Sequence, residues 1–278
     1  MANTINWGQA AVENTIDYGQ GATDNTISWG KSQTLSPSGE TNITGAGGTP
    51  AFTNTLSTLF DGTDDYVDCG STSYLQNLSE FSVSLWAKQT TAARTECIIG
   101  DWGFDTDGNF AIETGLLSGS ATKLTFYIKE LSGTVRSIQT QNYVFTENVW
   151  NHIAITFNSG TPNIYVNGTA QGLNVPSLPT SLAYGNGTIN IGRFRGLGRN
   201  FNGTIDEVSV FNTELSQTNI TDIYNLGTPT DISAMSGLVS WWRMGDGSTY
   251  PTINDAAGSN NGTMTNMSSA NFVTDVPT

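Results

Sequence analysis

Short segments of alternating apolar and polar residues follow one another from about residue 55 onward, and Gly, Asn and Asp separate them. A period of two places every second side chain on the same face of a strand. In residues 81–87, for example, Phe81, Val83, Leu85 and Ala87 share one face. Such segments, repeated at short intervals, predict an antiparallel β-sandwich. The clearest predicted strands cover residues 81–87, 123–128, 152–157, 163–166, 188–191 and 203–211.

Two local signals add detail to this all-β pattern. The dipeptide Asn167-Gly168 favours a type I′ hairpin turn, because both of its positions need a positive φ. One short helix is expected within residues 215–226, where Leu215, Ile220 and Ile223 form an apolar face.

Charge and cysteine content exclude several classes of function. Lys and Arg number 10 against 24 Asp and Glu, which gives a formal net charge of -14. We therefore expect neither nucleic-acid binding nor binding to anionic membranes. No apolar run of 18 residues occurs, so no membrane span is predicted. Cys69 and Cys97 are expected to be buried free thiols rather than the basis of a disulfide-built fold.

Three copies of one phrase open the chain at a spacing of eleven residues: Asn-Thr-Ile, one variable residue, an aromatic residue and Gly. Each copy is typical of a short strand closed by a Gly turn, and one such strand cannot bury its own apolar residues. The copies must therefore stack on each other or on another surface. We predict an attachment or assembly segment whose docking residues are Ile5, Trp7, Ile16, Tyr18, Ile27 and Trp29.

The changes in composition along the chain predict four parts. Residues 1–30 hold the β-repeats, and residues 31–55 form a flexible linker of small polar residues. Residues 56–227 form the sandwich domain, and residues 228–278 form a C-terminal segment that completes it.

Four phrases, in order, resemble the laminin-G-like jelly roll of the concanavalin A-like lectin/glucanase superfamily. They are Phe-Asp-Gly-Thr-Asp-Asp-Tyr-Val at 60–67, the strand at 81–87, Trp-Asn-His-Ile-Ala-Ile-Thr-Phe at 150–157 with the strand and turn up to Gly168, and the stretch from Ile191 to Phe211. The resemblance spans roughly residues 56–227 and implies an all-β, antiparallel jelly-roll sandwich. A shared fold is weak evidence for function.

One departure from that family concerns the order of the phrases. The family usually begins with a Leu-Val-x-x-Trp strand ahead of Phe-Asp-Gly, but here this phrase occurs at residues 238–244, followed by an Asp-and-Gly turn at 255–262. One hypothesis is a circularly permuted jelly roll whose C-terminal segment fills the slot of the first strand. The alternative is a partial second module that packs elsewhere or on a neighbouring subunit.

Catalytic chemistry is not expected. The glucanases of this superfamily place acids at alternating positions of one strand, and the nearest acids here, Asp206 and Glu207, are adjacent. Adjacent strand residues point to opposite faces, so we expect that they cannot act as a catalytic pair. His152 is the only histidine, and it lies in a strand phrase typical of the family, which favours a structural role. The protein is therefore predicted not to be an enzyme.

One metal follows from the resemblance. Jelly rolls of this superfamily often hold a structural Ca²⁺ between an acidic residue of an early strand or loop and an Asp of the last strand. That implies Asp61 and Asp206 as ligands, and carboxylate oxygens suit this hard cation. The alternative is that both are turn or edge residues that water or the backbone satisfies.

The N-terminal repeats and the Trp-Trp-Arg-Met-Gly-Asp phrase resemble structural proteins of tailed bacteriophages. This implies a virion protein, either a capsid decoration or a head or tail fibre, assembled in the host cytoplasm. Its expected partners are capsid or tail proteins, bound through the repeats, with a homotrimer and host surface glycans as further expectations. The alternative is a cellular adhesin or an extracellular carbohydrate-binding lectin.

Overall fold

The computed structural model describes residues 52–90, 95–101, 109–118, 121–129, 133–182, 187–195 and 198–278. Contacts divide the chain into two units, Met1–Ala51 and Phe52–Thr278, so the second unit begins four residues before the predicted boundary at residue 56. The predicted β-repeats, their docking residues and most of the predicted linker lie outside the described residues.

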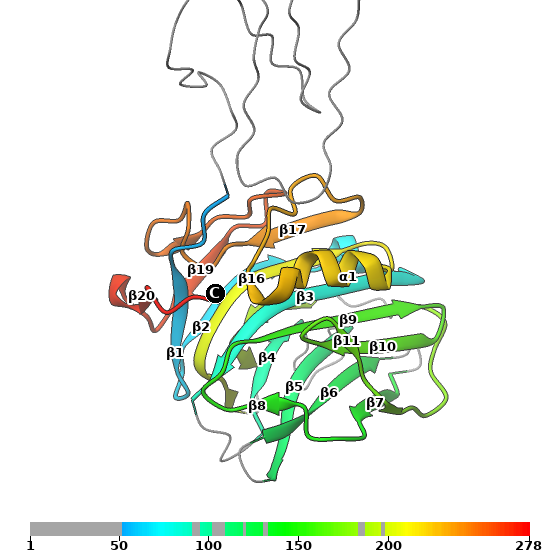
Figure 1. Ribbon diagram of the computed structural model, residues 1–278. Helices are drawn as coiled ribbons and strands as arrows, with labels where there is room; N and C mark the ends of the chain where they lie inside the picture. The colour runs from blue at the N-terminus through cyan, green and yellow to red at the C-terminus, as the bar shows by residue number, and fades with distance from the viewer. Residues whose placement is uncertain are drawn as a thin grey trace, which may run out of the picture. The chain divides into compact units, whose positions relative to one another are not determined.

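Two antiparallel sheets make up the described unit, which confirms the predicted all-β sandwich (Figure 1). In the first sheet the strand order is β11-β10-β9-β3-β16-β1-β20, and β17 also pairs with β16. Its strands are β1 (Ser57–Asp61), β3 (Glu80–Gln89), β9 (Asn151–Asn158), β10 (Thr161–Val166), β11 (Thr169–Ala170), β16 (Asn202–Phe211), β17 (Leu238–Trp242) and β20 (Phe272–Val273).

The second sheet has the order β12-β7-β6-β5-β4-β13-β2-β19-β18, with β8 paired to β6. Its strands are β2 (Tyr66–Ser71), β4 (Cys97–Gly100), β5 (Phe110–Ser118), β6 (Ala121–Lys129), β7 (Val135–Thr140), β8 (Phe145–Thr146), β12 (Leu173–Asn174), β13 (Thr188–Ile191), β18 (Thr252–Ile253) and β19 (Gly262–Thr265). A separate hairpin joins β14 (Arg193–Phe194) and β15 (Arg199–Asn200).

The alternating side chains of both sheets meet in one apolar core. Phe81, Val83, Leu85 and Ala87 of β3 all lie in it, as the period of two predicts. The second sheet contributes Ile112, Phe126 and Ile138 from three neighbouring strands, among others. The predicted hairpin turn is also confirmed, because Asn167 and Gly168 between β10 and β11 have φ angles of 50° and 74°.

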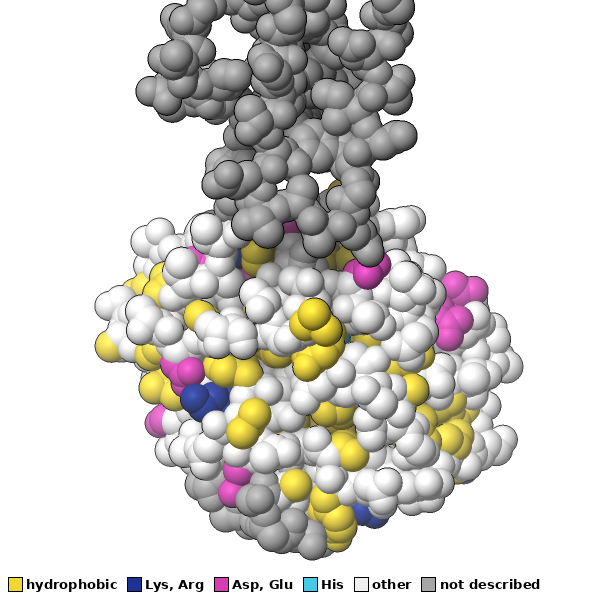
Figure 2. Space-filling view, viewed as in Figure 1, with side chains coloured by type: hydrophobic (Ala, Val, Ile, Leu, Met, Phe, Trp, Pro, Cys, Tyr) yellow, Lys and Arg dark blue, Asp and Glu magenta, His cyan; other side chains and the backbone are white. Residues whose placement is uncertain are grey.

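A second apolar cluster covers the outer face of the first sheet, where α1 (Gln217–Tyr224) lies across β3 and β16 (Figure 1). Ser216 caps the helix by accepting a hydrogen bond from the backbone N–H of Asn219, which explains why the helix begins at Gln217, directly after Ser216. Ile220 and Ile223 are its buried residues. On this side of the domain, Figure 2 shows scattered apolar side chains and few charged ones.

In the part of the chain that the structure describes, three short 3-10 helices complete the regular structure: η1 (Ser73–Leu75), η2 (Asn225–Gly227) and η3 (Ser269–Asn271). Within the described residues, no helix has the length and apolar character needed to cross a membrane. Cys69 and Cys97 are buried free thiols, as predicted.

The C-terminal segment contributes strands to both sheets. In the first sheet, β17 pairs with residues 208–211 of β16, and β20 pairs with β1. In the second, β19 pairs with β2. Trp242 of β17 is fully buried in the main core. The segment therefore packs within the same sandwich, which is the arrangement that the permutation hypothesis requires.

Candidate functional site

A row of polar residues crosses the outer face of the second sheet. Glu113 of β5 lies opposite Thr125 of β6, Thr125 lies opposite Gln139 of β7, and Gln139 lies opposite Asn174 of β12. We call these four residues the outer polar row. Because Ile112, Phe126 and Ile138 beside them point into the core, the row residues must point away from it.

Arg199 of the β14–β15 hairpin covers one end of this row. Its Nη1 lies 2.6 Å and 2.9 Å from the two carboxylate oxygens of Glu113. Burial raises the pKa of the Glu113 carboxyl, and the hydrogen bond and positive charge of Arg199 oppose that shift. The fully buried carboxylate is thereby paired, while the Arg199 side chain stays 34 % exposed.

A groove of about 470 Å³ opens at the other end of the row. Its lining residues are Val135, Arg136, Ser137, Asn174, Val175 and Pro176. Strand β12 pairs with Gln139 and Thr140 of β7, and among the described residues no strand pairs with the earlier part of β7 on that side, along the groove. Val135 and Val175 are 37 % and 48 % exposed, so the groove offers apolar contact surface beside polar groups.

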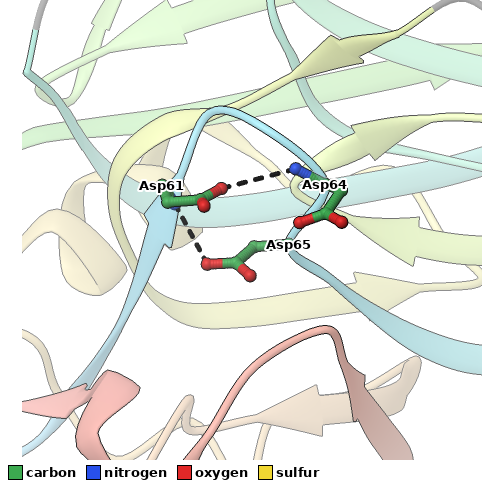
Figure 3. Close-up of side chains that lie close together, drawn as sticks. All are labelled: Asp61, Asp64 and Asp65. Carbon is green, nitrogen blue, oxygen red and sulfur yellow. Dashed lines mark hydrogen bonds between the residues drawn. The ribbon is translucent and has the colours of Figure 1, made fainter.

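Three carboxylates gather on the loop between β1 and β2. Figure 3 shows Asp61, Asp64 and Asp65 close together, and one oxygen of each lies within 4.8 Å of the others. Asp61 accepts backbone hydrogen bonds from Thr63 and Asp64, and Asp65 accepts one from Asp61. Burial raises the pKa of Asp65, a shift that its backbone hydrogen bond opposes.

The two ligands that the resemblance implied do not lie together. Asp61 pairs with Asn202 at one end of the β1–β16 ladder, and Asp206 lies four residues further along β16. At about 3.3 Å per residue, their backbones are about 13 Å apart. Asp61 belongs to the carboxylate loop, whereas Asp206 is buried and accepts a hydrogen bond from Asn54. A single cation bridging both residues does not fit this arrangement.

The expectation that Asp206 and Glu207 face opposite sides of their strand is wrong. The pairing of β16 with β3 shifts between Asp206 and Ser209, and Glu207 has a φ of 48°. Ile205 and Val208 on either side both point into the core, so the extra residue of this β-bulge turns both acids outward. Both are nevertheless buried, with relative exposures of 0 % and 6 %.

His152 has the structural surroundings that the sequence favours. Its Nε2 lies 2.8 Å from Ser84 Oγ, and its ring packs against Trp86 and Tyr224. Burial lowers its pKa to about 3. Phe194 of β14 is 5 % exposed and packs on Cys97 and Ala111, so it offers no open surface for a sugar ring.

Sequence reasoning missed the outer polar row and the groove. The polar positions of β5, β6 and β7 are readable as the solvent side of alternating strands. The alignment of these polar positions into one row cannot be read from the sequence, because it depends on the register between strands and on the pairing of the two-residue strand β12.

The chain belongs to the concanavalin A-like lectin/glucanases superfamily, since the laminin G family model with that description matches residues 61–221, more than half of the chain. A "putative carbohydrate binding protein" from Bacteroides ovatus ATCC 8483 superposes with a TM-score of 0.58 at 19 % identity, covering 81 % of this chain and 62 % of that protein. This chain therefore spans less than two thirds of its length.

A heptameric SAP-like pentraxin from Limulus polyphemus superposes with a TM-score of 0.50 at 14 % identity, covering 62 % of this chain and 82 % of the pentraxin. At such identities both likenesses concern the fold alone. No curated protein matches the chain.

Proposed function

We propose that this chain is a non-enzymatic virion structural protein, a capsid decoration or a head or tail fibre, that displays a carbohydrate-binding sandwich on an N-terminal attachment segment. The glycan site is the groove together with the outer polar row. The observation that carries this assignment is Asn174, which belongs to the row and also lines the groove. The Bacteroides ovatus protein, which shares the fold, is described as carbohydrate binding, and this supports the same class of ligand.

The chemistry of the groove fits a neutral glycan. Val135, Val175 and Pro176 offer apolar surface for the C–H faces of sugar rings, while Ser137 and Asn174 offer hydrogen-bonding groups for hydroxyls. The net charge of -14 disfavours strongly anionic glycans.

A non-enzymatic role is supported by the state of the two adjacent acids. Asp206 accepts hydrogen bonds from the Asn54 side chain and the Glu207 backbone, and Glu207 is bound by Trp241 and Arg243. Since both carboxyls are buried and engaged, neither is placed to meet a substrate.

A glycan array probed with the full chain tests the binding function. Val175→Arg fills the groove with a long cation and should weaken capture of the bound glycan at least about tenfold, which corresponds to 1.4 kcal/mol. Val149→Arg is the matched control, because Val149 is 50 % exposed, close to the 48 % of Val175, and lies outside the groove. A wild-type chain that captures no glycan contradicts the proposed binding function.

The attachment role is tested separately, by light scattering with size-exclusion chromatography. We expect the full chain to be a trimer and a chain without residues 1–45 to be a monomer, because the repeats need a partner surface. If both are monomers, a pull-down with capsid protein tests docking. Glycan binding without any capsid or tail binding would favour the alternative, an adhesin or extracellular lectin.

Calcium belongs to the proposal through Asp61, Asp64 and Asp65. Three carboxylates within 4.8 Å of one another supply the hard oxygen ligands that Ca²⁺ takes. If the ion is structural, EDTA should lower the melting temperature and Asp64→Asn should remove that effect. An unchanged melting temperature after EDTA would remove calcium from the proposal.

A further inference from the structure

Residues 52–55, which we call the strap, enter the domain at a gap between two strands. Strand β17 lies along residues 208–211 of β16, and β1 lies along residues 202–205, both on the edge of β16 opposite β3 (Figure 1). On that edge, between the two strands, Asp206 and Glu207 have no paired strand residue among the described residues, although Asp206 faces Trp86 of β3 on the other edge. The strap crosses this gap just before β1 begins.

Polar contacts tie the strap to both sides of the gap. Asn54 Nδ2 donates to Asp206 Oδ2 over 2.8 Å. Thr55 donates twice to Asp246, from its hydroxyl over 2.5 Å and from its backbone N–H over 2.7 Å. Arg243 donates to the carbonyl of Thr53. Two of the three residues that receive the strap, Arg243 and Asp246, belong to the C-terminal segment.

An aromatic contact joins the same two parts. The Phe52 ring stacks on Trp241 at a centroid distance of 6.0 Å, and the Arg243 guanidinium lies 4.4 Å from the Phe52 ring centre. Arg243 and Trp241 also hold Glu207, at 3.1 Å and 2.5 Å. Loss of the strap would therefore uncover Trp241 and Arg243, which pair the buried carboxyl of Glu207.

We propose that the strap is a lock that holds the C-terminal segment in the sandwich, so that displacement of the N-terminal segment loosens β17. The backbone between β17 and the strap partner Asp246 is short, and Gly245 lies against Leu56, the residue that follows the strap, where an added Cβ would come within 2.6 Å of the Leu56 Cβ. The chain directly after the strap is thus packed closely against the C-terminal segment, which couples the position of the strap to that of the segment.

Hydrogen exchange of the full chain, read by mass spectrometry, tests the lock. Phe52→Ala removes the stacking on Trp241, and Thr55→Val removes one hydrogen bond to Asp246 with little change of shape. Both should speed exchange of the β17 amides, by about tenfold for Phe52→Ala and less for Thr55→Val. Tyr143→Ala is the control, since it truncates an aromatic residue that is 46 % exposed and contacts Lys123 instead.

Faster exchange confined to the strap, with β17 unchanged in both variants, would overturn the proposal. If Phe52→Ala does not fold, Thr55→Val decides alone, because its domain keeps the aromatic stack. Glycan binding does not enter this readout, so the lock can fail while the proposed function holds, and the reverse.

Discussion

Burial sets the protonation state of His152. It is fully buried, its Nε2 is bonded to Ser84, and its Nδ1 has no partner among the described residues. With its pKa lowered to about 3 by burial, the ring should stay neutral where an exposed histidine takes up a proton near pH 6.5. Because it is the sole histidine, its ring signals in NMR spectra are unambiguous. We expect them not to titrate between pH 8 and pH 4, and a midpoint near 6.5 would contradict the structure.

At the same scale, sequence reasoning succeeds for His152 and fails for Asp206 and Glu207. The structural role of His152 followed from the family phrase around it. The period of two only turns its side chain away from Ile153 and Ile155 of the core, and it is Tyr224 of α1 that packs over it there. The two acids depend on one residue with a positive φ, which no composition signal marks because Glu207 is not a glycine. A bulge of this kind reverses the facing of every later residue in a simple alternation.

Among the elements, β17 decides whether the C-terminal segment is part of the domain. Trp242 is fully buried, and its Nε1 donates to the carbonyl of Asn260 over 2.6 Å. Trp242→Ala should cost about 3–5 kcal/mol of unfolding free energy, because it leaves a large cavity in the main core. Urea unfolding of the full chain measures this loss. A change below about 1 kcal/mol would mean that the segment packs elsewhere in solution.

Most strands were predictable from the sequence, whereas the strands with which they pair were not. The predicted strands lie within or coincide with β3, β6, β9, β10, β13 and β16, since each carries its own alternation. For β17, whose phrase stands at the C-terminal end of the chain, only the resemblance to the jelly-roll family suggested a place in the sandwich. The two-residue strands β12 and β20 carry too few residues for any period, so the groove beside β12 had no signal of its own.

For the whole molecule, the raised carboxyl pKa values predict a dependence of stability on pH. Burial raises the pKa of Glu207 to about 7, against the opposing charge of Arg243, and it raises those of Asp101 and Glu113 as well. A carboxyl with a raised folded pKa contributes stability below its unfolded pKa, near 4.5 for Glu, and loses it as the pH rises through the folded value. The melting temperature should therefore be higher at pH 6.5 than at pH 8.5.

Two further electrostatic effects contribute to the dependence of the melting temperature on pH. Acidification also reduces self-repulsion in a chain of net charge -14, which works in the same direction. Below pH 6.5 the neutral, buried His152 opposes the trend, because the unfolded chain takes up a proton there. Differential scanning calorimetry from pH 5.5 to 9 measures the sum. A melting temperature that rises toward pH 8.5 would contradict the structure.

The central claim is that the groove and the outer polar row bind a glycan. Backbone amide shifts in NMR spectra of the full chain, followed as the best array ligand is added, test it most directly. The account predicts that the perturbed amides cluster on β7 and on residues 173–175, around Ser137, Gln139 and Asn174. Perturbations that gather instead at the carboxylate loop of residues 61–65, or that appear nowhere on the second sheet, would contradict it.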